Sequence, residues 1–124
     1  MTPAQAWTYE KDTPYVPSPL LYRGAVYFLK VNSGILTSLD AKTGAVRFTE
    51  RLAAVPNVYA SPVAADGRIY VLGREGTTAV LEAGPAAKVL ATNVLSEPTD
   101  ATPALVDSEL YLRGAKSLYR LSAN

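Results

Sequence analysis

The sequence contains no cysteine and no histidine. Without cysteine, disulfide frameworks, iron–sulfur clusters and thiol nucleophiles are excluded. Without histidine as well, the usual zinc sites and every mechanism that relies on an imidazole base are excluded. These two absences remove most of the common catalytic and metal-binding chemistries before any motif is considered.

An excess of one charge and long apolar runs are absent too. The 12 basic and 11 acidic residues leave a formal net charge of +1, which gives no electrostatic footprint for nucleic acid. Every apolar run is far shorter than the roughly 20 residues that a membrane helix needs. Residues 1–7 lack the charged region and apolar core of a signal peptide. We therefore expect no nucleic-acid partner, no membrane span and no signal peptide in this chain.

What the sequence does have is a threefold repeat. Ser/Thr-Pro pairs end at Pro19, Pro62 and Pro103, a period near 40 residues. A small turn residue and a tyrosine follow each proline at the same two offsets. The turn residues are Gly24, Gly67 and Ser108, and the tyrosines are Tyr27, Tyr70 and Tyr111.

Each repeat predicts short antiparallel strands. Asp66-Gly67 between two apolar runs favours a type I′ hairpin turn, because both central residues of that turn need positive φ. No segment shows a sustained helical period, so we expect no helix. The predicted strands cover 20–22, 26–31, 35–39 and 45–52, then 63–65, 69–72, 77–81 and 87–95, then 104–106, 110–112 and 117–121. Four antiparallel strands at this period predict an all-β fold of β-propeller blades.

The strand count divides the chain. Residues 13–52 and 53–95 are predicted to be complete blades, and 96–124 a three-stranded partial blade without its outer strand. Residues 1–12 are expected to be the outer strand of a preceding blade. About three blades cannot close a ring, because propellers use about 4–8. We therefore expect a fragment that meets further propeller blades, or copies that form a homo-oligomer by exchanging the Trp7 strand.

Two stretches carry a family resemblance. Residues 66–71 read Asp-Gly-Arg-Ile-Tyr-Val, and residues 39–48 read Leu-Asp-Ala-Lys-Thr-Gly-Ala-Val-Arg-Phe. With Ser61-Pro62 they resemble the pyrroloquinoline-quinone-like (PQQ-like) propeller repeat. Phe48 stands where that repeat has tryptophan, and Trp7 is similar to that tryptophan in the preceding blade. The resemblance covers nearly the whole chain and is greatest to the C-terminal portion of the bacterial family that includes the propeller lipoprotein of outer-membrane protein assembly.

The resemblance implies a fold and a compartment but no cofactor. It implies a periplasmic or extracellular location. Dehydrogenases of the family hold the quinone with Ca²⁺, a stacking tryptophan and a vicinal disulfide. Cysteine is absent here, and the single tryptophan, Trp7, is expected in an edge strand. In the second blade the family's tryptophan position falls at Leu90 or nearby. We therefore expect no cofactor and no metal.

No catalytic residue emerges from the motifs. Residues 40–44 contain Lys-Thr but lack the spacing of a phosphate-binding loop. We expect a turn there, with Gly44 at positive φ and Asp40 bonded to local backbone. Residues 73–76 are expected to form a hairpin turn rather than a dinucleotide-binding loop. The carboxylates form no recognisable acid–base pair, and nothing positions a Ser–Lys nucleophile. The sequence therefore predicts a protein that is not an enzyme.

The candidate binding residues lie in loops. In a propeller, the connections between blades and the turns between second and third strands share one face. The candidates on that face are Asp12, Tyr15, Asn32, Asn57, Tyr59, Glu75, Asp100 and Lys116. Tyr15 and Tyr59 either contact a partner or cover a strand start. The three repeated tyrosines are expected to pack between blades rather than to form a stacking platform. We therefore expect a non-catalytic scaffold for a protein partner; the alternative is a fragment of a quinone-dependent dehydrogenase-like propeller whose cofactor residues lie outside this chain.

Overall fold

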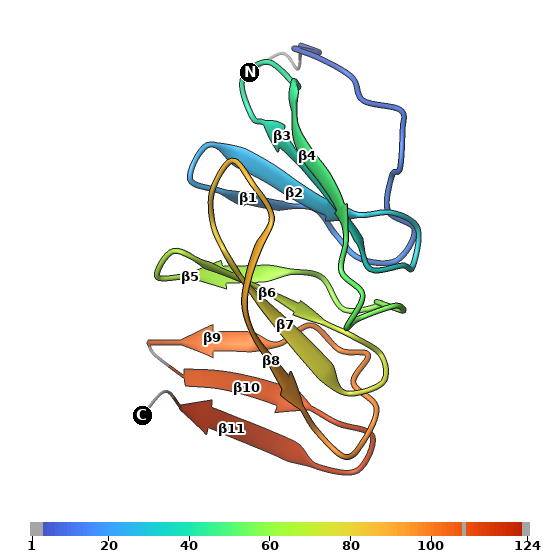
Figure 1. Cartoon of the computed structure of the whole chain (residues 1–124), viewed down its shortest axis with the longest axis vertical. Coiled ribbons are helices and arrows are strands. Elements are labelled where there is room, and N and C mark those ends of the chain that lie inside the picture. The colour runs from blue at the N-terminus through green and yellow to red at the C-terminus, as the bar shows by residue number, and fades with distance from the viewer. Residues whose placement is uncertain (1–3, 108, 123–124) are drawn as a thin grey trace.

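The computed structural model describes residues 4–107 and 109–122, and these form eleven strands in three antiparallel sheets (Figure 1). Ser108 of the third predicted turn and the outermost residues 1–3 and 123–124 lie outside the described residues. No helix occurs in the described part, and none therefore could cross a membrane. The prediction of an all-β chain is confirmed.

The three sheets lie one on another along the length of the molecule and are called blades one to three (Figure 1). Within each blade the strands follow one another in chain order. Blade one contains β1 (Leu20–Tyr22), β2 (Ala25–Leu29), β3 (Ile35–Asp40) and β4 (Val46–Arg51); blade two contains β5 (Val63–Ala65), β6 (Arg68–Leu72), β7 (Thr77–Glu82) and β8 (Lys88–Val94); blade three contains β9 (Ala104–Val106), β10 (Glu109–Arg113) and β11 (Leu118–Ser122). The stack is open, as expected for about three blades of a propeller.

The predicted hairpin turns have the backbone that their residues favour. Asp66 and Gly67 have φ of 52° and 76°, and Arg23 and Gly24 have 49° and 77°. Two consecutive positive φ values are those of a type I′ turn, whose twist matches the strands on either side. Gly44 is also at positive φ, and the Asp40 carboxylate accepts hydrogen bonds from the backbone N–H groups of residues 42 and 43. Both local predictions are confirmed.

In the second strand of each blade, successive side chains point to opposite faces of the sheet and so toward different neighbouring blades. In β2, Tyr27 and Leu29 join the apolar cluster between blades one and two, which Ile69 and Val71 of β6 complete from the other side. Tyr70 packs against the smaller cluster between blades two and three. Tyr111 holds the same position in blade three, where no described blade covers that side, and it is half-buried, as Tyr70 is. The repeated tyrosine therefore serves packing wherever a next blade is present.

Hydroxyl groups connect the inner strands. The backbone N–H of Ser18 donates to Ser61 Oγ at 2.8 Å, and the backbone N–H of Ser61 donates to Thr102 Oγ1 at 2.9 Å. These are the residues that precede the three repeated prolines. The Ser/Thr-Pro repeat therefore links each blade to the next at the inner strand.

The N-terminal segment covers the open side of blade one. The Trp7 indole Nε1 donates to the Ala41 carbonyl at 2.9 Å, and its ring lies against Gly44. The Tyr9 ring lies 5.7 Å from that of Phe28. Residues 4–12 pair with no strand of the described chain. Their assignment to a preceding blade therefore stays a prediction, and Trp7 contacts its own chain.

Candidate functional site

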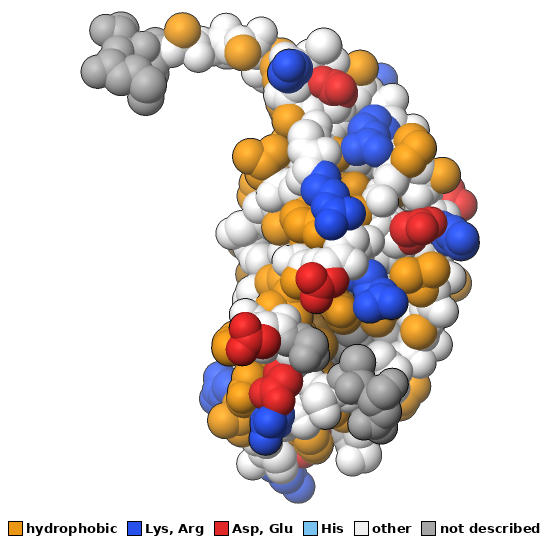
Figure 2. Space-filling view, turned by 90° about the vertical axis from the view of Figure 1, so that its left-hand side faces the viewer, with side chains coloured by type: hydrophobic (Ala, Val, Ile, Leu, Met, Phe, Trp, Pro, Cys, Tyr) orange, Lys and Arg blue, Asp and Glu red, His pale blue; other side chains and the backbone are white. Residues whose placement is uncertain are grey.

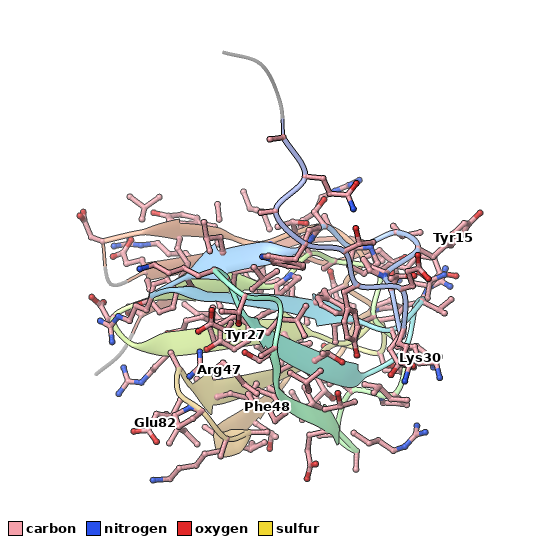
Figure 3. The ribbon with its side chains drawn as sticks, turned by 90° about the horizontal axis from the view of Figure 1, so that it is seen from above. Tyr15, Tyr27, Lys30, Arg47, Phe48 and Glu82 are labelled. Carbon is pink, nitrogen blue, oxygen red and sulfur yellow. The ribbon has the colours of Figure 1, made fainter. Side chains whose placement is uncertain are left out.

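Loops gather at one end of the blades, which we call the loop face. It consists of the turns 30–34, 73–76 and 114–117 and the connectors 52–62 and 95–103, all along the right-hand side of Figure 1. Figure 3 shows Tyr15 and Lys30 at this end of the strands and Glu82 at the other. All eight predicted contact residues lie at the loop face or in the adjoining N-terminal segment. The opposite end shows basic, acidic and apolar side chains interspersed, without an extended area of one charge (Figure 2).

Backbone hydrogen bonds hold each connector between two turns. From the first connector, Val58 N–H donates to the Asn32 carbonyl at 2.9 Å, while the Asn57 carbonyl accepts from Arg74 N–H at 2.7 Å. The second connector repeats this arrangement, since Thr99 N–H donates to the Arg74 carbonyl at 3.0 Å. These bonds satisfy backbone groups that would otherwise need water or side chains. The loops consequently present their side chains from a defined backbone.

Arg74 is the centre of the side-chain contacts on this face. Its guanidinium carbon lies 4.3 Å from the centroid of the Tyr59 ring, a cation–π contact. Its Nε lies 3.2 Å from Asp100 Oδ1. Next to it, Asn57 Nδ2 donates to Glu75 Oε1 at 2.6 Å. These five residues are called the Arg74 cluster; four of them were predicted candidates, and Arg74 was missed although it lies in the noted 73–76 turn.

A cleft of about 200 Å³ adjoins the Arg74 cluster. Asp100 belongs to both, and Arg113 also lines the cleft. The remaining lining is Pro98, Ala101, Gly114 and Ala115. Carboxylate and guanidinium groups that line a small cleft can pair with the backbone or charged groups of a bound polypeptide.

The other predicted residues form no part of this cluster. The Asp12 carboxylate pairs with Lys30 Nζ at 3.0 Å, and Asn32 Oδ1 accepts from the Val16 N–H at 3.3 Å. Tyr15 nearby is 79% exposed, whereas Tyr59 is half-buried under the Arg74 guanidinium. The blade-one end of the loop face is therefore a separate group of polar contacts.

Glu97 holds the turn that carries Lys116, and sequence reasoning missed it. Its Oε1 accepts from the backbone N–H groups of Lys116 at 3.0 Å and Ser117 at 2.9 Å. These bonds, that of Lys116 above all, hold the pKa of the Glu97 carboxyl below its ordinary value of 4.5. The separation of 19 residues between donor and acceptor leaves no local sequence signal.

Acid should therefore loosen the 114–117 turn. Because its pKa is lower in the folded state, the charged Glu97 stabilises the fold above about pH 4.5, and this stabilisation is lost as pH falls below 4.5 through the lowered pKa. Glu97→Gln should lower the Tm at neutral pH and approach the wild type in acid. Thermal unfolding followed by circular dichroism across pH, with the exposed Glu50→Gln as control, measures this difference. A Tm difference that stays constant across pH would contradict the assignment.

The folded chain resembles solved β-propellers. It superimposes on BamB from Moraxella catarrhalis with a TM-score of 0.66 and 24% identity, covering 84% of this chain and 32% of that one. It also matches the quinohemoprotein alcohol dehydrogenase from Comamonas testosteroni (TM-score 0.68, 17% identity, 88% and 18% covered) and a europium-containing methanol dehydrogenase (0.64, 16%, 84% and 22%). The chain thus spans about a third of the BamB chain and about a fifth of each dehydrogenase. No family model matches the sequence, and no curated protein matches it.

These likenesses show the fold of propeller blades, shared with dehydrogenases that are named for their alcohol substrates. The described residues of this chain do not fit a quinone–Ca²⁺ site. They contain no group of three or more acidic side chains that could hold a metal ion. The Trp7 ring already lies against Gly44. A cofactor of that kind would need residues outside the described part of this chain.

Proposed function

We propose that this chain is a non-catalytic propeller segment that binds a protein partner through the loop face. The Arg74 cluster carries the proposal. Arginine and tyrosine are enriched among the residues that dominate binding energy at protein interfaces. Here the two side chains are stacked on each other before any partner arrives.

The cluster is both ordered and accessible. The side chains of Arg74 and Asp100 are 49% and 47% exposed, so their remaining polar atoms are open to a partner. The Tyr59 ring restricts the guanidinium, and backbone hydrogen bonds restrict the loops that carry it. Side chains that are already ordered lose less conformational entropy on binding, which raises affinity. An exposed ion pair by itself adds little to stability. Recognition of a partner therefore explains the Arg74–Asp100 pair better than stabilisation of the fold does.

The alternative function is favoured only by the shared fold. A dehydrogenase-like propeller could include these blades, but its cofactor residues would have to lie outside this chain. Exchange of the Trp7 segment between copies likewise stays a prediction.

Selection of peptide ligands tests the proposal. A random peptide library displayed on phage is panned against the immobilised chain, and the recovered peptides are synthesised and titrated. We expect Arg74→Ala to weaken their binding by about tenfold, corresponding to about 1.4 kcal/mol for an interface arginine. Arg74→Lys should restore little, because an ammonium does not stack on Tyr59 as a planar guanidinium does.

Lys42→Ala is the matched control. Lys42 is an exposed cation in the turn after β3, at the opposite end of the blade. Its loss should leave peptide affinity unchanged. Peptides that bind the wild type and the Arg74→Ala chain equally well would show that binding, if any, uses another surface.

A further inference from the structure

Two outer-strand positions, one in blade one and one in blade two, are equivalent in their strand register. In blade one, Phe48 of β4 is paired with Ser38, directly after a bulge in the strand register. In blade two, Ala91 of β8 is paired with Val80, again directly after a bulge. Ala91 therefore occupies the position of Phe48, and Leu90 is the extra residue of the bulge. The aromatic position of blade two, expected at Leu90 or nearby, is therefore Ala91.

In blade one this position is filled by an aromatic ring. The Phe48 ring lies 6.3 Å from that of Tyr27 and packs against the core between blades one and two (Figure 3). Ala83 and Ala87, from the loop before β8, pack against the same core. An aromatic ring thus fills this position at the junction between blades one and two.

At the equivalent position in blade two the space is open. Beside Ala91 is a hollow of about 530 Å³ between β8 and blade three. Tyr70 and Val80 line it from blade two, and Leu110 and Leu121 from blade three. The polar residues Asn93 and Ser122 line it as well. Three of these side chains also belong to or pack against the apolar cluster between the two blades, so the hollow continues an existing interface; they are Tyr70, Leu110 and Leu121. The alanine methyl group cannot fill a space that a phenylalanine ring fills one blade earlier.

We propose that this hollow binds an aromatic side chain of a partner polypeptide, with an acidic residue next to it. An apolar cavity of about 150 Å³ is enough to take a benzene ring, and a buried aromatic side chain removes about 150–250 Å² from water. The Arg68 side chain lines the same hollow and provides the positive charge for a neighbouring carboxylate. The hollow lies away from the Arg74 cluster, so this site stands whether or not the loop face binds a partner.

The dipeptide N-acetyl-Asp-Trp-amide is the probe, titrated into the whole isotope-labelled chain and followed by NMR. We expect saturable shifts at the amides of residues 80, 91 and 121, and nuclear Overhauser contacts from the indole to the methyl groups of Leu110 and Leu121. N-acetyl-Asp-Leu-amide should bind about tenfold more weakly, because the isobutyl group buries less surface. N-acetyl-Lys-Trp-amide should also bind more weakly; equal affinity would overturn the assignment of Arg68.

Ala91→Trp supplies the ring from the chain itself and should abolish probe binding. Cavity filling should also raise the Tm by about 4 °C. Val89→Trp is the matched control, because Val89 lies on the same strand but is paired with Leu81, whose side chain faces blade one. It should leave binding intact.

Unchanged probe binding in Ala91→Trp would overturn the proposal, and so would the absence of indole contacts to the leucine methyl groups in the wild type. The search for indole contacts uses only the wild type and so does not depend on whether any variant folds.

Light scattering distinguishes a different partner from a second copy of this chain as the occupant. If the wild-type chain is a dimer and Ala91→Trp is a monomer, the occupant is a second copy of this chain rather than a different partner.

Discussion

Replacing Tyr27 with alanine should lower the free energy of unfolding by about 3–5 kcal/mol. Tyr27 is 2% exposed and packs in the cluster between blades one and two, beside the Phe48 ring. Its removal leaves a cavity that the surrounding strands cannot close without moving one blade against the other. Because small domains are stable by only about 5–15 kcal/mol, the loss should be plain in urea denaturation followed by circular dichroism.

Tyr111→Ala is the control for position within the repeat. Tyr111 occupies the same place in blade three, but its side chain faces a side that no described blade covers, and its hydroxyl donates to Glu109 Oε2 at 3.0 Å. We expect a cost of about 1 kcal/mol, typical of a half-exposed position. Similar costs at the two tyrosines would show that blade three is covered in solution, which the open stack does not predict.

Gly76→Ala should cost about 3 kcal/mol or more and disrupt the Arg74 cluster as well. Gly76 has φ of 101°, and a Cβ there would lie 2.4 Å from the Glu97 carbonyl oxygen and 2.8 Å from that of Leu95. Both obstructing atoms are backbone, in a connector tied to this turn by the Leu95 N–H bond to the Gly76 carbonyl at 2.9 Å. Relief of the clash must therefore displace the connector that carries Asp100.

Gly24→Ala separates backbone strain from the clash. Gly24 has φ of 77°, but a Cβ there meets nothing within 4 Å. The strain alone should cost about 1–2 kcal/mol. Urea denaturation compares the two variants, and hydrogen exchange at the Thr99 amide, which donates to the Arg74 carbonyl, reports on the connector. Equal stabilities with unchanged exchange would contradict the close approach at Gly76.

Sequence reasoning succeeded where the controlling interactions are local. The Asp66-Gly67 turn depends on the φ preferences of two adjacent residues, and the 40–44 turn on one carboxylate with its own neighbouring N–H groups. The offset from proline to tyrosine recurs because each blade repeats one strand arrangement. Residues 4–12, the described part of the segment predicted to belong to a preceding blade, pair with no strand of the described chain, so that assignment stays a prediction.

The composition of the candidate site was predicted only in part. Loops at one end were expected, and Asn57, Tyr59, Glu75 and Asp100 do lie together there. Arg74, which connects them, was missed because its contacts come from two different connectors. Glu97 was missed because it acts on a turn in the next blade.

The sequence by itself determined the repeat, the turns and the all-β class, because apolar alternation and turn backbone depend on residues a few positions apart. Only the tertiary structure decided which equivalent side chains are buried, which loops meet and where space is left. Tyr27 and Tyr111 are the same letter at the same repeat position, yet only Tyr27 has a neighbouring blade over it. Ala91 is an ordinary strand residue in the sequence, and its significance comes from the side chains around it that leave a hollow. Burial and empty space depend on the side chains that surround a residue, and contacting residues of adjacent blades are about one repeat apart in the sequence.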